Sequence, residues 1–350
     1  MCLLLPLVCR AILVSAVGLP NILRVDVPTD CATHYNPQMV CDPTLRLSES
    51  KRTRSTTLFV IASITTLALG CSIAGPAPAA IPPAPSSLAA DNVLIHSASG
   101  NSISAWVAKG DKGRGAVLLL HGVGSNRLSM LPRAEFLHKL GFTILALDFR
   151  AHGESPGEFT TFGARESLDA AAALEFLKTV APGERVGVIG VSMGGAAALL
   201  GAEPLSVDAL VLESVYPTIR DAVRDRLVAL SGPLGFASRN LTSPVLGLIH
   251  RRTGVSESEM QPIQRIGSVH SPILVLAGTA DPYTPLKEAK ALFARAPSPK
   301  TFWQVNGARH EDLYKYLGAE YERRVGDFLT RNLSTAQEPR AASGLDTNRD

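Results

Sequence analysis

Cysteine is missing from most of this chain, because all five cysteines fall within the first 71 of its 350 residues. They are Cys2, Cys9, Cys31, Cys41 and Cys71. Disulfides and cysteine-ligated metal sites both need thiols, and the long region after residue 71 has none. We therefore expect that region to fold without a disulfide and without a cysteine-based metal centre.

Aromatic residues and an excess of either charge are also scarce. Aromatic side chains make up 5% of the chain, and the formal net charge is +3, with acids and bases intermixed rather than in blocks. A nucleic-acid surface needs concentrated basic residues, so no nucleic-acid partner is expected. The chain also lacks Gly-x-x-x-x-Gly-Lys-[Ser/Thr], His-Glu-x-x-His and Cys-x-x-Cys. No cofactor and no metal is implied.

The apolar run from Leu58 to Gly70 is shorter than the roughly 20 residues that a membrane-spanning helix needs. Lys51, Arg52 and Arg54 precede the run, and small residues end it. A basic start, a short apolar core and a small-residue end are typical of a cleaved signal peptide, here at 51–71. We therefore expect an exported protein.

The end of this signal, Leu67-Ala68-Leu69-Gly70-Cys71, resembles a bacterial lipobox. The resemblance implies that Cys71 is the site of lipid attachment and that the mature protein is a cell-envelope lipoprotein tethered to a membrane. A general secretory signal that happens to contain a cysteine is the alternative, and it would release a secreted or periplasmic soluble protein.

Residues 1–50 precede the signal and include a weaker apolar stretch from Leu3 to Leu19. One interpretation is a translation start further along, for example at Met39, which makes 1–50 an artefact or a disordered extension. The other is a signal peptide at 1–19 followed by a second apolar segment. Beyond Cys71, the proline-rich and alanine-rich segment 72–91 is expected to be a stiff linker without core elements, because proline fixes φ and lacks an N–H donor.

From residue 92 to 332, short apolar runs alternate with helical stretches. Continuous apolar strands that alternate with helices predict an α/β domain whose mostly parallel sheet is covered on both faces. The predicted strands lie within 103–108, 115–120, 143–147, 186–189, 209–212, 273–276 and 301–305, and the predicted helices within 131–140, 164–179, 194–202, 286–296 and 313–329.

Three further features complete the expected organisation. The first two strands flank the turn Lys-Gly-Asp-Lys-Gly-Arg-Gly and are expected to form a hairpin,. The alternation breaks at 216–271, where no clear strand occurs, and this segment is interpreted as an inserted lid or cap. The tail at 333–350 is polar and expected to be disordered.

The strongest chemical signal is Gly190-Val191-Ser192-Met193-Gly194, which follows a predicted strand and precedes a helix of small residues. Gly-x-Ser-x-Gly in this context predicts a strained turn that raises the serine hydroxyl above the sheet. A side chain at either glycine would collide across that turn. Ser192 is therefore the candidate nucleophile.

A serine hydroxyl needs a base to remove its proton and an acid to orient that base. In the chain order Ser, Asp, His, the acid candidate is Asp281, in a Gly- and Pro-containing turn after a strand,. Glu213, at the end of another strand, is the alternative acid. The base candidate is His310, in a loop after the last predicted strand.

The tetrahedral intermediate also needs backbone N–H donors for its oxyanion. Met193 supplies one because it follows the nucleophile. The second is expected from Leu120-His121-Gly122-Val123-Gly124, and Val123 is the candidate. The alternative is a glycine turn with no role in binding.

These segments closely resemble the α/β-hydrolase family over about 92–332. The run Asp148-Phe149-Arg150-Ala151-His152-Gly153-Glu154-Ser155 is similar to a family loop, with Ala151 in place of the usual glycine. The resemblance implies an eight-stranded sheet with a helical lid insertion, and its nearest branch is serine aminopeptidase-like or acylglycerol-lipase-like. That loop is more often structural than catalytic in the family, so Arg150 and His152 are not candidates.

The resemblance implies hydrolysis of an ester, thioester or amide through an acyl-enzyme, and it does not choose among these bonds. The expected substrate is a small-molecule or lipid-like acyl compound whose apolar chain is of short to medium length. Two other classes remain open. An acyltransferase would use the same triad, and a binding lipoprotein would keep the fold without the chemistry.

Overall fold

The computed structural model describes residues 74–232 and 235–335. The predictions that concern 1–50, the signal peptide at 51–71 with Cys71, and the tail from residue 336 lie outside the described residues. Within the described part, no helix combines the length and the apolar character needed to cross a bilayer.

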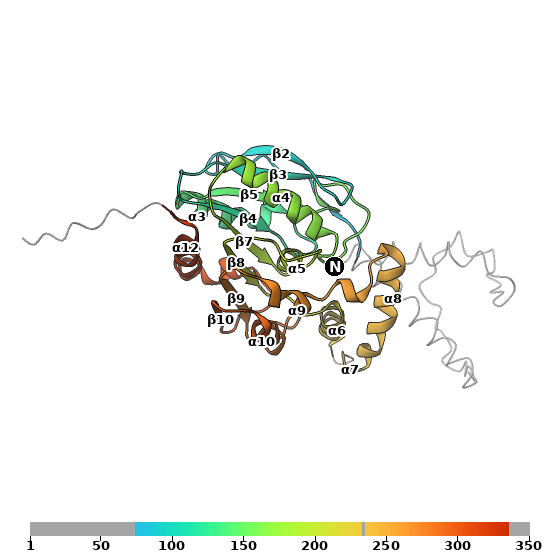
Figure 1. The fold of residues 1–350 in the computed structure, drawn as a ribbon. Helices are drawn as coiled ribbons and strands as arrows, with labels where there is room; N and C mark the ends of the chain where they lie inside the picture. The colour runs from blue at the N-terminus through green and yellow to red at the C-terminus, as the bar shows by residue number, and fades with distance from the viewer. Residues whose placement is uncertain (1–73, 233–234, 336–350) are drawn as a thin grey trace, which may run out of the picture. The chain divides into compact units, whose positions relative to one another are not determined.

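An eight-stranded sheet forms the centre of the domain, in the order β10-β9-β8-β7-β4-β5-β3-β2 (Figure 1). All neighbours from β5 to β10 are parallel, whereas β3 is antiparallel to both β2 and β5. The prediction of a mostly parallel α/β sheet is confirmed. The strands are β2 (Asp91–His96), β3 (Ser102–Ala108), β4 (Ala116–Leu120), β5 (Thr143–Leu147), β7 (Val186–Val191), β8 (Ala209–Glu213), β9 (Ile273–Gly278) and β10 (Lys300–Val305).

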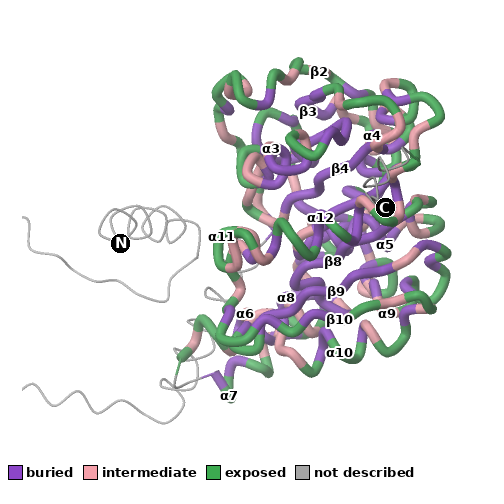
Figure 2. The backbone as a smooth tube through the Cα atoms, turned by 90° about the vertical axis from the view of Figure 1, so that its left-hand side faces the viewer, coloured by how far each residue is buried: buried purple, intermediate pink, exposed green. Residues whose placement is uncertain are grey.

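Helices cover both faces of the sheet, as predicted. Within β4, residues 116, 118 and 120 pack into one hydrophobic cluster, and residues 117 and 119 pack into the other. Figure 2 shows the central strands as buried along their length. Because both faces of a strand are buried, its sequence is continuously apolar. One face packs on α3 (Leu131–Lys139) and α12 (Ala319–Leu333), and the other on α4 (Glu166–Val180), α5 (Met193–Leu199) and α10 (Leu286–Arg295).

The predicted hairpin between 103–108 and 115–120 is wrong. Strand β3 pairs with β2 on one side and with β5 on the other, so β5 lies between β3 and β4. The real hairpin joins β2 to β3. The helix predicted at 313–329 is likewise divided into α11 (Leu313–Leu317) and α12, because Gly318 between them has φ +53°.

The segment predicted as a linker packs against the domain over its described part, 74–90. Its short strand β1 (Ala77–Pro78) pairs in parallel with β6 (His152–Gly153). Ile81 and Leu88 are buried among the apolar residues that face α3 and α12. The prediction that this segment contributes no core element is therefore wrong for residues 74–90.

Proline does not prevent this pairing, because a strand alternates the direction of its amides. The N–H of Ala77 donates to the Ala151 carbonyl at 2.7 Å, and the N–H of Ala79 donates to the Gly153 carbonyl at 2.9 Å. Pro78 stands between these two donors, where no N–H is needed.

The segment at 216–271 is helical and connects β8 to β9. It contains α6 (Ile219–Leu230), α7 (Gly235–Ser238), α8 (Thr242–Thr253) and α9 (Pro262–Arg265), which Figure 1 shows in yellow to orange. The side chains of Ile219 and Val223 are buried and belong to the same cluster as α4 and α5. This insertion therefore lies beyond the carboxyl end of β8, where it can contribute to a site.

Candidate active site

Ser192 forms the sharp turn between β7 and α5. Its backbone has φ +51° and ψ −111°, a conformation that L-residues rarely adopt, and its N–H donates to the Glu213 carbonyl at 2.8 Å. A Cβ at Gly194 would lie 2.2 Å from the Leu120 carbonyl oxygen, and one at Gly190 would lie 2.6 Å from the Gly195 Cα. Both glycines are therefore required for the close approach of strand and helix. The turn has the strained geometry that the sequence predicts.

His310 and Asp281 meet across two neighbouring loops, which follow β10 and β9. The imidazole Nδ1 lies 2.8 Å from Asp281 Oδ2. The other carboxylate oxygen, Oδ1, accepts from the backbone N–H groups of Tyr283 and Thr284 at 2.8 and 2.9 Å. The Asp281 side chain is almost fully buried, and that of His310 is 21% exposed. The turn thus fixes the carboxylate, and the carboxylate orients the imidazole.

Ser192 and His310 both line two cavities. The first, about 30 Å³, is mainly apolar, with Val123, Phe162, Met193, Tyr216, Ile219, Ala222, Val223, Arg226, Tyr283 and Thr284 as its other lining residues. The second, about 250 Å³, also has a mainly apolar wall but carries more polar and charged side chains, and it is named the polar cavity for them. Its other lining residues are Gly122, Val123, Ser125, Ser129, Met130, Arg133, Val191, Ser214, Arg226, Glu311 and Asp312. A molecule whose reacting atom lies at Ser192 can therefore extend in two directions, of which the second is roomier and has more charged side chains.

Met193 and Val123 line the first cavity together with Ser192. Met193 begins α5, and Val123 lies in the loop after β4. A Cβ at Gly122 would lie 3.5 Å from the Ser192 Cβ, so this loop passes close to the serine. Neither the Met193 nor the Val123 backbone N–H donates to an acceptor within 74–232 or 235–335. Both amides are thus available to an oxyanion.

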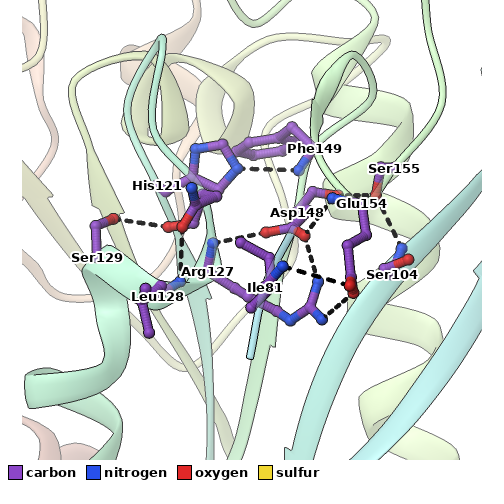
Figure 3. A network of polar contacts seen from close by, with 11 residues as sticks. Ile81, Ser104, His121, Arg127, Leu128, Ser129, Asp148, Phe149, Glu154 and Ser155 are labelled. Atoms are coloured by element: carbon purple, nitrogen blue, oxygen red, sulfur yellow. Dashed lines mark hydrogen bonds and ion pairs between the residues drawn. The ribbon is translucent and has the colours of Figure 1, made fainter. Parts of the chain in front are cut away.

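A buried histidine that sequence reasoning did not single out fixes the loop that carries Val123. His121 Nε2 accepts from the Phe149 N–H at 3.0 Å, a contact visible in Figure 3. The proton is therefore on Nδ1, which donates to the Gly122 carbonyl at 2.8 Å. Burial, followed by the nearby His152, lowers the pKa of His121 to about 3,. His121 is consequently neutral and acts as a rigid bridge.

His152 holds the same loop through a second contact. Its Nε2 accepts from the Gly124 N–H at 3.1 Å, and its Nδ1 donates to the Arg150 carbonyl at 2.9 Å. The His121 and His152 rings lie 5.2 Å apart. The loop 148–155 that resembles a family motif is thus structural, and its role is to position the loop beside Ser192.

An ion-pair network whose Arg127 and Asp148 side chains are buried continues this support, as Figure 3 shows. The Asp148 carboxylate accepts from the backbone N–H of Arg127 at 2.6 Å and of Glu154 at 2.9 Å. The Arg127 guanidinium bonds to the carboxylates of Asp148 and Glu154. Burial raises the pKa of Asp148 above its ordinary value, and the donors from Arg127 and Glu154 offset only part of that rise,. Ala151, which stands where the family usually has glycine, has φ +59°, so this turn carries local backbone strain,.

Glu213, the alternative acid, is bonded elsewhere. Its carboxylate accepts from Arg133 Nη2 at 2.7 Å and Nε at 3.2 Å, and also from the Tyr321 hydroxyl. Arg133 Nη2 also lies 2.7 Å from Asp312 Oδ1, near the start of α11. Glu213 is therefore committed to a buried network, and Asp281 is the carboxylate that contacts His310.

The chain belongs to the alpha/beta hydrolase family, whose model matches residues 117–317. An uncharacterized protein of Mycobacterium tuberculosis is 30% identical over 269 residues, which cover 75% of this chain and 86% of that protein. The mouse serine hydrolase BPHL is 27% identical over 250 residues, 62% of this chain and 80% of that one.

Solved structures agree with this assignment. A Pyrococcus furiosus esterase is similar with a TM-score of 0.60 and 28% identity, and the match covers 73% of this chain and 98% of the esterase. Family membership and this neighbour support a hydrolase.

Proposed function

We propose that this protein is a serine hydrolase that cleaves carboxylic ester bonds through an acyl-enzyme on Ser192. One observation carries the proposal: Ser192, on its strained turn, opens to the same two cavities as His310, whose Nδ1 is held by Asp281 at 2.8 Å. A nucleophile, a base and an orienting acid in this relation are the requirements of acyl transfer.

In the first half of the reaction, Ser192 Oγ attacks the ester carbonyl carbon while His310 Nε2 takes the hydroxyl proton. A C–O bond forms, and the carbonyl π electrons move onto the oxygen, which the Met193 and Val123 amides stabilise. Asp281 keeps the His310 tautomer correct and stabilises the imidazolium. The intermediate then expels the alcohol, and His310 returns the proton to its oxygen.

In the second half, water attacks the acyl carbon of the Ser192 ester, and His310 accepts the proton of that water. The bond between the acyl carbon and Ser192 Oγ breaks, His310 protonates the serine, and the carboxylic acid leaves. The same groups therefore serve both halves in reverse roles.

The two cavities suggest how an ester is seated. The apolar cavity of about 30 Å³ accommodates a short acyl group, and the polar cavity of about 250 Å³ accommodates the alcohol. Ile219 and Val223 of α6 line the apolar cavity, so the 216–271 insertion acts as the lid over the acyl group. Turnover of p-nitrophenyl esters should decline steeply beyond the shortest acyl chains, and equal turnover across chain lengths would count against this seating.

The test of the proposed reaction compares Ser192→Ala with Ser129→Ala, using p-nitrophenyl acetate. Ser129 lines the polar cavity and its hydroxyl bonds only to the local Asn126 carbonyl among the described residues, so it is a matched control. Ser192→Ala should lower kcat at least about a thousandfold, whereas Ser129→Ala should retain most activity. Retained turnover in Ser192→Ala would remove Ser192 as the nucleophile.

A further inference from the structure

Arg226 of α6 is placed where a substrate would contact it. It is half-buried and lines both cavities that open onto Ser192 and His310. Its guanidinium carbon lies 4.7 Å from the centre of the Tyr283 ring. That ring in turn meets the His310 imidazole edge to face, with 5.3 Å between centroids. Arg226 thus contacts Tyr283, and Tyr283 contacts the candidate base His310, so the insertion places a positive charge near that base.

The donors of Arg226 are not used inside the described part of the chain, where it makes no ion pair and no side-chain hydrogen bond. Its neighbours on the same helix differ. Arg224 donates hydrogen bonds to Asp221, Asp225 and Glu288. Arg220 pairs with Glu257. A half-buried guanidinium beside a cavity, stacked on one aromatic face, is therefore available to a ligand.

The carboxylates near the cavities do not neutralise Arg226. No Asp or Glu lines the apolar cavity. In the polar cavity, Asp312 is already paired with Arg133 at 2.7 Å. Glu311, the other acidic lining residue, is exposed and accepts from the Arg309 backbone N–H at 2.9 Å. The positive charge of Arg226 is thus not paired with an acidic side chain that lines either cavity.

We propose that Arg226 binds an anionic group, in the simplest case a carboxylate, on the alcohol side of the ester. In the proposed reaction the acyl group takes up the apolar cavity of about 30 Å³, whereas the polar cavity of about 250 Å³ has room for a charged group. The planar guanidinium matches the two oxygens of a carboxylate. This inference rests on the proposed function, and it names Arg226 as a specificity-determining residue for acidic ester substrates.

The experiment uses two acetyl esters that differ in one charge: 4-acetoxybenzoate, which is anionic, and 4-acetoxybenzamide, which is neutral. Arg226→Gln should lower kcat/KM for the anionic ester about tenfold or more, mainly through KM, and should change the neutral ester less than about twofold. Arg226→Lys should recover part of the preference for the anionic ester, because lysine keeps the positive charge but cannot donate two parallel hydrogen bonds to a carboxylate. Arg220→Gln, on the same helix, should leave the ratio unchanged.

Equal losses for both esters in Arg226→Gln would overturn the proposal, because they would show that Arg226 only holds the lid against Tyr283. Binding of 4-hydroxybenzoate and 4-hydroxybenzamide, measured by calorimetry, tests the subsite independently of hydrolysis. The wild type should bind the anion more tightly, and Arg226→Gln should lose that difference. A wild type that shows this binding but cleaves neither ester would contradict the proposed function alone, and equal binding of both compounds would contradict the subsite.

Discussion

His310 Nδ1 lies 2.8 Å from Oδ2 of Asp281 in the loop after β9, while Glu213, which ends the neighbouring strand β8, is bonded to Arg133. Two carboxylates therefore lie at the carboxyl ends of adjacent parallel strands, and of these only Asp281 contacts the imidazole. The other is part of a buried network that reaches Asp312, two residues after His310. Replacing Asp281 and replacing Glu213 should therefore have different effects on the protein.

Asp281→Asn and Glu213→Gln should differ in kinetics. Asp281→Asn removes the group that sets the His310 tautomer, so kcat for p-nitrophenyl acetate should fall about 10³–10⁴-fold. Glu213→Gln should keep kcat within a few-fold but unfold at lower urea concentration, because Arg133 loses a buried partner. An inactive Glu213→Gln beside an active Asp281→Asn would make Glu213 the acid.

Local geometry explains which parts of the site could be predicted. Ser192 was predictable because the strand, the glycines and the helix that shape its turn are contiguous in sequence. The support of the Val123 loop was not, because His152 reaches Gly124 only through the adjacency of β4 and β5 in the sheet. The same missing information, that β5 lies between β3 and β4, produced the wrong hairpin.

The linker was misjudged for a different reason. The high proline content predicts a linker, but it does not show that Pro78 lies at a position of β1 where the pairing with β6 needs no backbone N–H donor. The position of Arg226 against Tyr283 could not be predicted either, since it depends on how α6 packs over the turn that contains Tyr283.

The packed segment 74–90 should contribute to stability. Leu88 is 1% exposed, so Leu88→Ala should lower the free energy of unfolding by about 2–5 kcal/mol,. Leu94→Ala is the matched control because Leu94 is 68% exposed, and it should cost far less. Urea unfolding measures both. A loss in Leu88→Ala no larger than in Leu94→Ala would restore the interpretation of this segment as a free linker.

His121 should make stability fall in acid. Burial lowers the pKa of His121 from 6.5 to about 3. Between these two pH values the unfolded chain binds a proton at His121, whereas the folded protein does not. The contribution of His121 to the free energy of unfolding therefore decreases as pH falls from 6.5 toward 3. Urea unfolding over this range should show a shallower pH slope in His121→Gln than in the wild type. Parallel slopes would contradict a buried neutral His121.

Glu288 should act in the opposite direction at the contact between α6 and α10. Burial, followed by the charge of Asp225, raises its pKa to about 8, although Arg224 opposes the shift. The folded protein then keeps a proton that the unfolded chain releases above pH 4.5, so its contribution to stability is lost as pH rises from 4.5 to 8. Glu288→Gln should flatten this decline in urea unfolding. An unchanged decline would show that Glu288 ionises normally.

The most direct test of the central claim is to map a fluorophosphonate label on the protein by peptide mass spectrometry. The account predicts one covalent adduct, on Ser192 in the peptide that spans β7 and α5, and no adduct in Ser192→Ala. An adduct on a different residue, or labelling that persists in Ser192→Ala, would contradict it.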